Sequence, residues 1–443
     1  MCKRKNNILY YIPLIPILLS CTPILSSCYE QTMPSSSVVK KYDGSDWYGL
    51  YGQFSEGDYN IDFENSKITY TNPYNLTYAH NLVLPDYVLY KQNQLAVFFD
   101  EGFFSGFPVQ GSIYLNIFLD NIPERMFENC FDVQIIYIKN KLVNVGERAF
   151  YQCVSLKSIE FAKDSQYSNL SIQQLWMSIE YIGDEAFYYT SFNFDIYFLR
   201  LKSIGFGAFD SSTQVKSVTF LKGSLLEQKD HRLQKSTFSN CWNIRSLTLN
   251  DAILGIEDSC CLGCYNLSKI DWPINSDEHS IYIGQKAFFN CTNLRKINSK
   301  IDSFPSFAPY YIDDEAFYGC ENLYIDDLDL GYSSQLFFRN TTHIGKYCFC
   351  DCNLIKSIKF INNSLLYICS YAFSGCDQLS RISFEDFGDV GPWWPSSKCI
   401  FNDICKFGTS YISPLAPFSK WKAFFELQVN VEIVNSWTFV VIK

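Results

Sequence analysis

One phrase recurs ten times across residues 122–384, and it constrains the fold more than any other feature of the sequence. The phrase reads I-G-x-x-A-F-x-x-C-x-x-L-x-x-I-x-F, and successive copies start 22 to 37 residues apart. A repeat this short cannot bury its own apolar side chains, so copies must stack on one another and form a solenoid. The copies start at Ile122, Val145, Ile182, Ile204, Leu233, Ile256, Ile283, Ile312, Ile344 and Ile368.

Two positions of the phrase are nearly constant. Counting the starting residue as position 0, position 5 is Phe in nine copies, and Cys261 replaces it in the sixth. Position 8 is Cys in eight copies, with Thr190 and Ser212 in the other two. Small, weakly polar side chains therefore fit position 8, and we expect most of these thiols to be buried packing groups.

The spacing of apolar residues changes within each copy. The first half, as in residues 283–291, has apolar residues at positions 0, 4, 5 and 8, which is helical spacing. Acidic residues crowd its start, where a helix dipole favours them. The second half, as in residues 156–161, alternates apolar and polar residues and predicts a strand. Each copy is therefore predicted to form a short helix followed by a short parallel strand.

The phrase resembles the BspA-like leucine-rich repeat, which occurs in surface proteins of bacteria and of some parasitic protists. The resemblance covers about 265 of 443 residues and implies an α/β solenoid of leucine-rich repeats over residues 121–385. Residues 411–414 and 421–425 look like the closing segment of such arrays, which implies a C-terminal cap over residues 386–443. The third copy departs from the phrase around residues 190–194 and the sixth at Cys260 and Cys261, so we expect those coils to be locally distorted.

The N-terminus has the pattern of an export signal. Lys3, Arg4 and Lys5 precede an apolar run over residues 8–19, which is the length of a signal-peptide core. Residues 1–28 are therefore predicted to be a signal peptide and the Ser-rich residues 29–41 a flexible tether. Cys28, and with a poorer match Cys21, ends a lipoprotein-like box and is a candidate for lipidation. Plain secretion and a retained anchor are the alternatives; in a protist, the sequons at Asn266 and Asn290 would matter instead.

Residues 42–120 fall outside the phrase. Runs such as 67–71 and 112–117, separated by Gly, Asn and Pro, predict strands. The region is either a small β-rich module or a set of degenerate coils that caps the array, and capping is favoured because a solenoid end otherwise exposes its core. Its aromatic residues Trp47, Tyr48, Tyr51 and Phe54 suit the core of such a cap better than a binding patch.

The sequence contains 18 cysteines, which raises the question of metals and disulfides. Two clusters, Cys260/Cys261/Cys264 and Cys348/Cys350/Cys352, have spacings that could ligate zinc. The repeat gives a simpler explanation, since most of these residues occupy packing positions, and no metal or cofactor is predicted. Cysteines off the ladder position are better candidates for disulfide pairing: Cys350, Cys369, Cys399 and Cys405.

The sequence predicts no enzyme. Its four histidines lie in the N-terminal region or in connections between copies, outside any recognised catalytic motif. The net charge of -10 and the lack of basic clusters argue against nucleic-acid binding.

One surface pattern points to binding. A basic side chain precedes the alternating strand residues in nearly every copy, and stacking is expected to align these residues as a positive row on an acidic protein. Such a row would attract an acidic glycan or an acidic protein patch; the alternative is that these positions are merely solvated. The candidates are Lys157, Lys216, Arg245, Lys269, Arg295, Lys296, Lys356 and Arg381.

We therefore expect an exported surface-held protein that binds proteins or glycans, in the manner of an adhesin, with contact to the membrane only through a possible lipid. The alternative is a non-binding spacer. An enzyme with a site in residues 42–120 is a third hypothesis that no motif supports.

Overall fold

The computed structural model describes part of the chain in detail. The described residues are 38–42, 45–49, 59–71, 79–84, 87–90, 93–107, 109–115, 119–225, 227, 231–272, 281–298, 310–323, 326–327, 332–333, 335–339, 341–361, 367–369, 371–379, 381–385, 431–435 and 438–441. They divide into two units, Met1–Asn193 and Phe194–Lys443, each of which is described by itself. In the described part, no helix has the length and apolar character needed to cross a bilayer.

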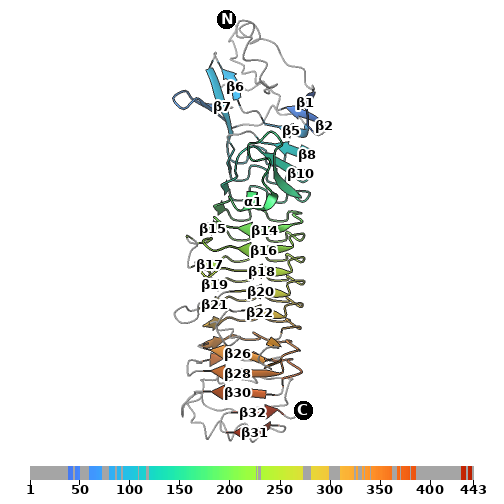
Figure 1. The fold of residues 1–443 in the computed structure, drawn as a ribbon, viewed down its shortest axis with the longest axis vertical. Coiled ribbons are helices and arrows are strands. Elements are labelled where there is room, and N and C mark those ends of the chain that lie inside the picture. The colour runs from blue at the N-terminus through green and yellow to red at the C-terminus, as the bar shows by residue number, and fades with distance from the viewer. Residues whose placement is uncertain are drawn as a thin grey trace. The chain divides into compact units, whose positions relative to one another are not determined.

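The second unit is built from stacked parallel strands (Figure 1). One stack, the long-strand stack, pairs each coil with the next in unbroken register. It consists of β14 (Asp195–Phe198), β16 (Ser217–Phe220), β18 (Ser246–Thr248), β20 (Lys269–Asp271) and β22 (Lys296–Asn298). A second, short-strand stack forms where each phrase begins. It consists of β17 (Arg232–Leu233), β19 (Gly255–Ile256), β21 (Tyr282–Ile283), β23 (Tyr311–Ile312), β27 (His343–Ile344) and β29 (Tyr367–Ile368), and β15 (Ser203–Ile204) begins the coil before them.

The C-terminal part of this unit continues the long strands in a separate sheet. Three of them are parallel, β26 (Gln335–Arg339), β28 (Ser357–Ile361) and β30 (Arg381–Glu385). The strand β32 (Thr438–Val441) then pairs antiparallel with β30, and β31 (Val431–Asn435) pairs antiparallel with β32 at the edge of the sheet. A small hairpin of β24 (Asp326–Asp327) and β25 (Tyr332–Ser333) precedes β26.

The first unit also contains a sheet of long parallel strands and a set of short parallel strands. Its long strands pair in parallel in the order β2 (Ser45–Gly49), β5 (Ala79–Val83), β8 (Val109–Tyr114), β10 (Val133–Ile138) and β12 (Ser158–Phe161), with β1 (Val38–Tyr42) antiparallel at the edge. The short strands are β9 (Asn121–Ile122), β11 (Asn144–Val145) and β13 (Tyr181–Ile182). A further sheet contains β3 (Tyr59–Asp62), β4 (Lys67–Tyr70), β7 (Asn93–Phe99) and β6 (Tyr87–Tyr90).

The predicted helix in every coil is wrong. The described residues contain one α-helix, α1 (Ile172–Trp176), which lies in the long connection between the second and third copies and starts with a capping box of Ser171 and Gln174. In the coils, positions 3 and 7 adopt left-handed backbone angles, as at Lys286 (φ 56°) and Asn290 (φ 57°). A right-handed helix cannot continue through such residues, so the segment forms consecutive turns.

Hydrogen bonding between coils explains these turns. The amides of Lys286, Phe288 and Asn290 donate to carbonyls of the next coil, at 3.0, 2.8 and 2.7 Å. Helical amides would instead bond within their own segment. The acidic residues at the start of this segment serve the same purpose, because the Asp258 carboxylate accepts the Gln285 amide of the next coil at 3.0 Å. These acidic residues stabilise the stacking of coils. Because the segment is not a helix, a helix dipole does not explain their position.

The Phe of position 5 forms a ladder of stacked rings in the core. The rings of Phe288, Phe317, Phe349 and Phe373 stack in succession at centroid distances of 5.1, 5.2 and 5.3 Å. All four are fully buried. Cys261 interrupts this ladder, but its amide still donates to the next coil at 2.8 Å, so the expected distortion of the sixth coil is wrong.

The ladder extends one coil upstream of the tenfold phrase. Phe104 stacks on Phe127 at 5.6 Å with the planes 8° apart, and its amide donates to Met126. The predictions for residues 1–37, which include Cys21 and Cys28, and for most of residues 386–443 concern residues outside the described part, and the side chains of Trp47 and its aromatic neighbours also lie outside it.

The cysteines of position 8 are buried packing groups, which confirms that prediction. Each described thiol of this ladder donates to a backbone carbonyl of the preceding coil, as Cys241 does to Phe209 at 3.0 Å. The full set is Cys130, Cys153, Cys241, Cys264, Cys291, Cys320, Cys352 and Cys376, with thiol to carbonyl distances of 3.0 to 3.3 Å. Thr190 fills this position with a hydroxyl that instead donates to the Phe187 carbonyl of its own coil at 3.2 Å.

Candidate binding surface

The candidate basic residues lie where each coil enters the long-strand stack. Lys216, Arg245 and Arg295 are exposed and occupy the position directly before a long strand. Their backbones are in register, because the Arg245 amide donates to the Lys216 carbonyl at 2.8 Å. Ser268 fills this position in the intervening coil, donating to Arg245 and accepting from Arg295. We call Lys216, Arg245 and Arg295 the first basic column.

The structure splits the predicted row in two. Lys269 pairs with Lys296 on one side and with Ser246 on the other, and Ser246 pairs in turn with Ser217, all one position later in the coil than the first basic column. We call Lys269 and Lys296 the second basic column. The two positions are adjacent on the coil, and together the columns place at least one basic residue on each of four successive coils.

Few acidic groups oppose these charges. Lys269 forms an ion pair with Asp271 at 2.7 Å, and Asp195 is the other acidic residue on these strands. Asp195 accepts a hydrogen bond from Ser217 at 2.6 Å. Within the described part of the chain, no carboxylate forms an ion pair with Lys216, Arg245 or Arg295.

The other three candidates are not brought into these columns. Lys157 is exposed and its amide donates to Gln134, but it belongs to the first unit. Lys356 and Arg381 lie on β28 and β30 or directly before them, in a different sheet from β14 to β22. The candidate surface therefore consists of the two basic columns of the second unit.

An exposed aromatic pair lies close by in sequence on the same coils. Trp242 and Tyr265 each follow the ladder cysteine, with 50% and 44% of their surface exposed and ring centroids 6.4 Å apart. The two residues are in register, since the Asn266 and Asn293 amides donate to their carbonyls. Sequence reasoning missed this pair, although aligning the copies on the ladder cysteine would have revealed it.

A column of side-chain amides lies between the aromatic pair and the basic columns along the chain of each coil. One amide residue occupies position 10 in four successive coils: Gln214, Asn243, Asn266 and Asn293. Asn243 donates to the Thr213 carbonyl at 2.7 Å, and Asn293 donates to Asn266 at 3.5 Å. The next residue in each coil is buried and apolar, as Ile244 and Leu267 are, so the chain alternates between core and surface here.

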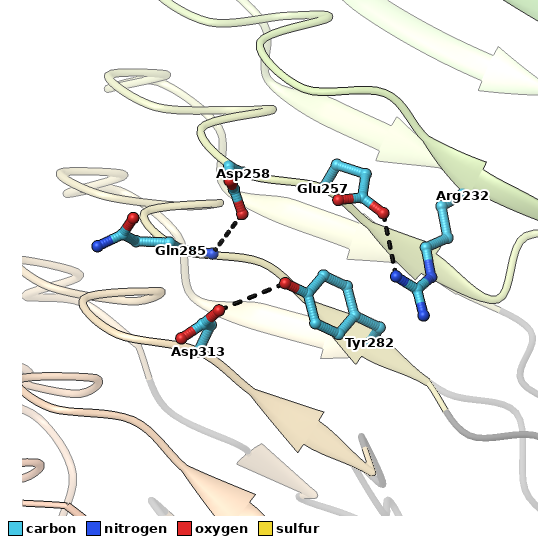
Figure 2. A network of polar contacts seen from close by, with 6 residues as sticks. All are labelled: Arg232, Glu257, Asp258, Tyr282, Gln285 and Asp313. Atoms are coloured by element: carbon cyan, nitrogen blue, oxygen red, sulfur yellow. Dashed lines mark hydrogen bonds and ion pairs between the residues drawn. The ribbon is translucent and has the colours of Figure 1, made fainter. Parts of the chain in front are cut away.

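The short-strand stack contains a different polar network, whose charged and polar groups bond to one another (Figure 2). Arg232 pairs with Glu257 at 3.1 Å and places its guanidinium 4.2 Å from the ring centre of Tyr282. The Tyr282 hydroxyl donates to Asp313 at 3.3 Å. Burial and the nearby carboxylate of Asp313 raise the pKa of Tyr282. These groups join successive coils to each other.

Gly284 shows how closely successive coils approach beside this network. A methyl group at Gly284 would lie 2.6 Å from the Asp258 nitrogen and 2.7 Å from the Glu257 carbonyl carbon. Backbone atoms cannot move aside as a flexible side chain can, so the approach of the preceding coil to residue 284 requires Gly there.

The described histidine and cysteine groups do not form a site. Burial lowers the pKa of His343, whose ring stacks on Tyr311 at 4.3 Å. Cys369 lies 3.9 Å from the same imidazole, and burial raises its pKa to about 11, which is unsuited to a nucleophile. Both Cys350 and Cys369, predicted to be candidates for pairing, are present as free thiols. Among the described residues no group of three potential ligands could hold a metal ion.

Comparison with known proteins finds a repeat pattern over the same part of the chain. The pattern described as "BspA type Leucine rich repeat region (6 copies)" matches residues 98–224, 180–324 and 331–390. None of the curated proteins matches the chain.

Solved structures of leucine-rich repeat proteins are similar. One, from Bacteroides ovatus, is 22% identical with a TM-score of 0.41 and covers 74% of this chain and 86% of its own. A leucine-rich cell surface protein from Faecalibacterium prausnitzii is 18% identical with a TM-score of 0.41 and covers 74% and 87%. Because the repeat pattern itself spans more than half of the sequence, the chain belongs to the BspA-type leucine-rich repeat family.

Proposed function

We propose that this chain is an exported, surface-held repeat protein that binds an acidic partner, in the manner of an adhesin, through the two basic columns of the second unit. One observation carries the proposal. Five basic residues lie on four successive coils, and three of them, Lys216, Arg245 and Arg295, form no ion pair with a described carboxylate. In a chain with a net charge of -10, such a local positive surface would steer acidic ligands to one place.

The coil spacing makes the charges regular. Parallel strands lie about 4.8 Å apart, so four coils present cationic side chains at that interval over roughly 15 Å. A polyanion with repeated charges would match this arrangement at several points at once. The alternative is a spacer, for which the basic side chains serve only to keep a strand edge soluble.

Charge reversal separates the two functions. The triple variant Lys216→Glu, Arg245→Glu and Arg295→Glu removes three attractions, each worth roughly 1 kcal/mol at an exposed site. We expect it to lose on the order of a hundredfold in affinity for heparin, with a weaker salt dependence. Affinity is measured by titration at several salt concentrations.

The matched control changes the same net charge elsewhere on the same unit. Lys222, Lys235 and Lys346 are exposed and lie outside the basic columns, so their triple reversal to Glu should leave heparin binding within about twofold of wild type. Equal losses in both triple variants, or no heparin binding by the wild-type protein, would reject a specific basic site and favour the spacer.

Export is the second part of the proposal. It rests on the apolar run of residues 8–19 and on the lipoprotein-like boxes that end at Cys21 and Cys28. We expect the mature chain in a bacterial host to begin at Cys28 with a lipid on its thiol. Mass spectrometry of the mature N-terminus tests this, because an unmodified cleaved terminus would indicate secretion and an intact Met1 would contradict export by cleavage.

A further inference from the structure

The repeat does not require an aromatic residue at the position of the exposed pair. In the other coils of the second unit the residue after position 8 is small, polar or charged: Thr213, Thr292, Glu321, Asn353 and Asp377. The coils carrying Trp242 and Tyr265 keep the same hydrogen bonds between coils as their neighbours. Two large rings that are half-exposed on adjacent coils therefore point to recognition of a ligand.

We propose that Trp242 and Tyr265 form a platform for sugar rings, so that the acidic partner of the basic columns is an anionic oligosaccharide. This inference rests on the proposed function and names its ligand class. The apolar C–H face of a pyranose stacks on an aromatic ring, and indole and phenol rings provide that surface together with a polar edge. The tilt of 46° between the two rings allows each to face a different sugar of one chain.

The amide column supplies the next element that a sugar requires. Side-chain amides both donate and accept hydrogen bonds, as the hydroxyl groups of a sugar do. Asn266 is exposed between Tyr265 and Lys269, and Gln214 is exposed one residue after Thr213. The Asn266 side chain already accepts from Asn293, which orients its amide along the stack.

The basic columns complete the arrangement on the same coils. Arg245 follows Trp242 by three residues, and Lys269 follows Tyr265 by four, with the buried Ile244 and Leu267 between them. Aromatic rings, amides and cations thus succeed one another across each coil. A sulfated or carboxylated sugar presents an apolar face, hydroxyl groups and an anionic group, which are the three partners that these side chains need.

A protein ligand fits this surface less well. The aromatic residues that dominate protein interfaces lie in pockets that are desolvated by a surrounding ring of contacts. Here the adjoining coils carry Thr213 and Thr292 at the position of the aromatic residues, and the residue that follows each aromatic residue in the chain is Asn. A repeating oligosaccharide also matches a repeating row of cations better than a single acidic protein patch does.

Two anionic probes distinguish the platform from charge alone. Heparin oligosaccharides carry sugar rings, whereas linear polyphosphate of similar total charge carries none. We expect Trp242→Ala with Tyr265→Ala to weaken heparin oligosaccharide binding by at least about tenfold and to leave polyphosphate binding unchanged. The reversed first basic column should lose both ligands.

A matched control and a conservative variant complete the experiment. Tyr310 is 44% exposed and lies on the short-strand stack, directly before β23, so Tyr310→Ala removes an equally exposed ring without affecting either ligand. Trp242→Phe with Tyr265 intact should retain most of the affinity, because a stacking ring remains. Thermal unfolding confirms that each variant is folded.

The outcomes are distinct. If the double alanine variant loses both probes equally, or neither, the sugar platform is wrong, while the proposed function survives provided that charge reversal still abolishes binding. If the wild-type protein binds neither probe, the proposed function fails and the platform fails with it. Selective loss of the oligosaccharide alone supports the platform.

Discussion

The free energy of unfolding of the reduced protein is expected to fall steeply above about pH 9, with cooperative unfolding near pH 10 to 11. Burial raises the pKa of the interior thiols above their ordinary value of 9.0. The pKa of Cys130 is raised to about 12, and the pKa values of Cys153 and Cys241 are raised well above 9.0. The same direction holds for Cys291, Cys320, Cys348, Cys352 and Cys376.

The sign follows from which state binds the proton. Below pH 9 the thiols are protonated in both states and contribute no pH dependence. Above pH 9 the unfolded chain releases these protons while the folded chain retains them, so unfolding becomes more favourable until the folded pKa is reached. Each thiol then contributes about 1.4 kcal/mol per pH unit, and eight together roughly 10 kcal/mol per pH unit. Domains have only about 5–15 kcal/mol in total.

Replacing one ladder thiol isolates its contribution. Cys241→Ser keeps a donor to the Phe209 carbonyl, in a position where another coil already has Ser212. We expect the slope of unfolding free energy against pH, measured by urea unfolding between pH 9 and 10.5 in reductant, to become smaller in magnitude by up to about 1.4 kcal/mol per pH unit. An unchanged slope would mean that the Cys241 thiol is accessible to solvent or oxidised, contrary to its complete burial.

The stacked architecture could be predicted from the sequence because it depends on side-chain identity. Phe at position 5 and Cys at position 8 recur where the coils are in register, and the alternating residues of each second half form the long strands. The identity of the side chains could not exclude the short helix that was predicted in each coil. Its spacing is also produced by two consecutive turns, and the deciding feature is a positive φ at residues such as Lys286 and Glu315, whose side chains give no sign of it.

The candidate surface was predicted in part. Exposure of Lys216, Arg245 and Arg295 followed from the pattern, because each lies beside an inward-facing apolar residue. The division into two columns did not, since it depends on which backbone positions pair between coils, and Lys269 and Lys296 are one residue later than the others. Trp242 and Tyr265 were missed because they belong to the variable positions, which repeat analysis sets aside.

Phe288→Ala is expected to destabilise the second unit by about 3–5 kcal/mol, the usual cost of removing a fully buried ring. Phe288 begins an unbroken run of the Phe ladder, stacking on Phe317 at 5.1 Å, while Cys261 fills the equivalent place in the preceding coil. The loss therefore includes a ring pair worth about 0.5–1.5 kcal/mol in addition to the buried area. Urea unfolding at pH 7 measures the change.

Phe289→Ala is the matched control, because it removes the same side chain one residue further along the coil. Phe289 is only partly buried and stacks on Tyr318 at 4.9 Å, at the surface of the coil, so we expect a cost of about 1 kcal/mol. Since each coil of a solenoid contacts only its neighbours, hydrogen exchange in Phe288→Ala should increase most in the coils that contain Cys261 and Phe317. Equal costs for the two variants would show that the stacked interior ring is not what holds successive coils together, and the hydrogen bonds between coils would then have to carry that role.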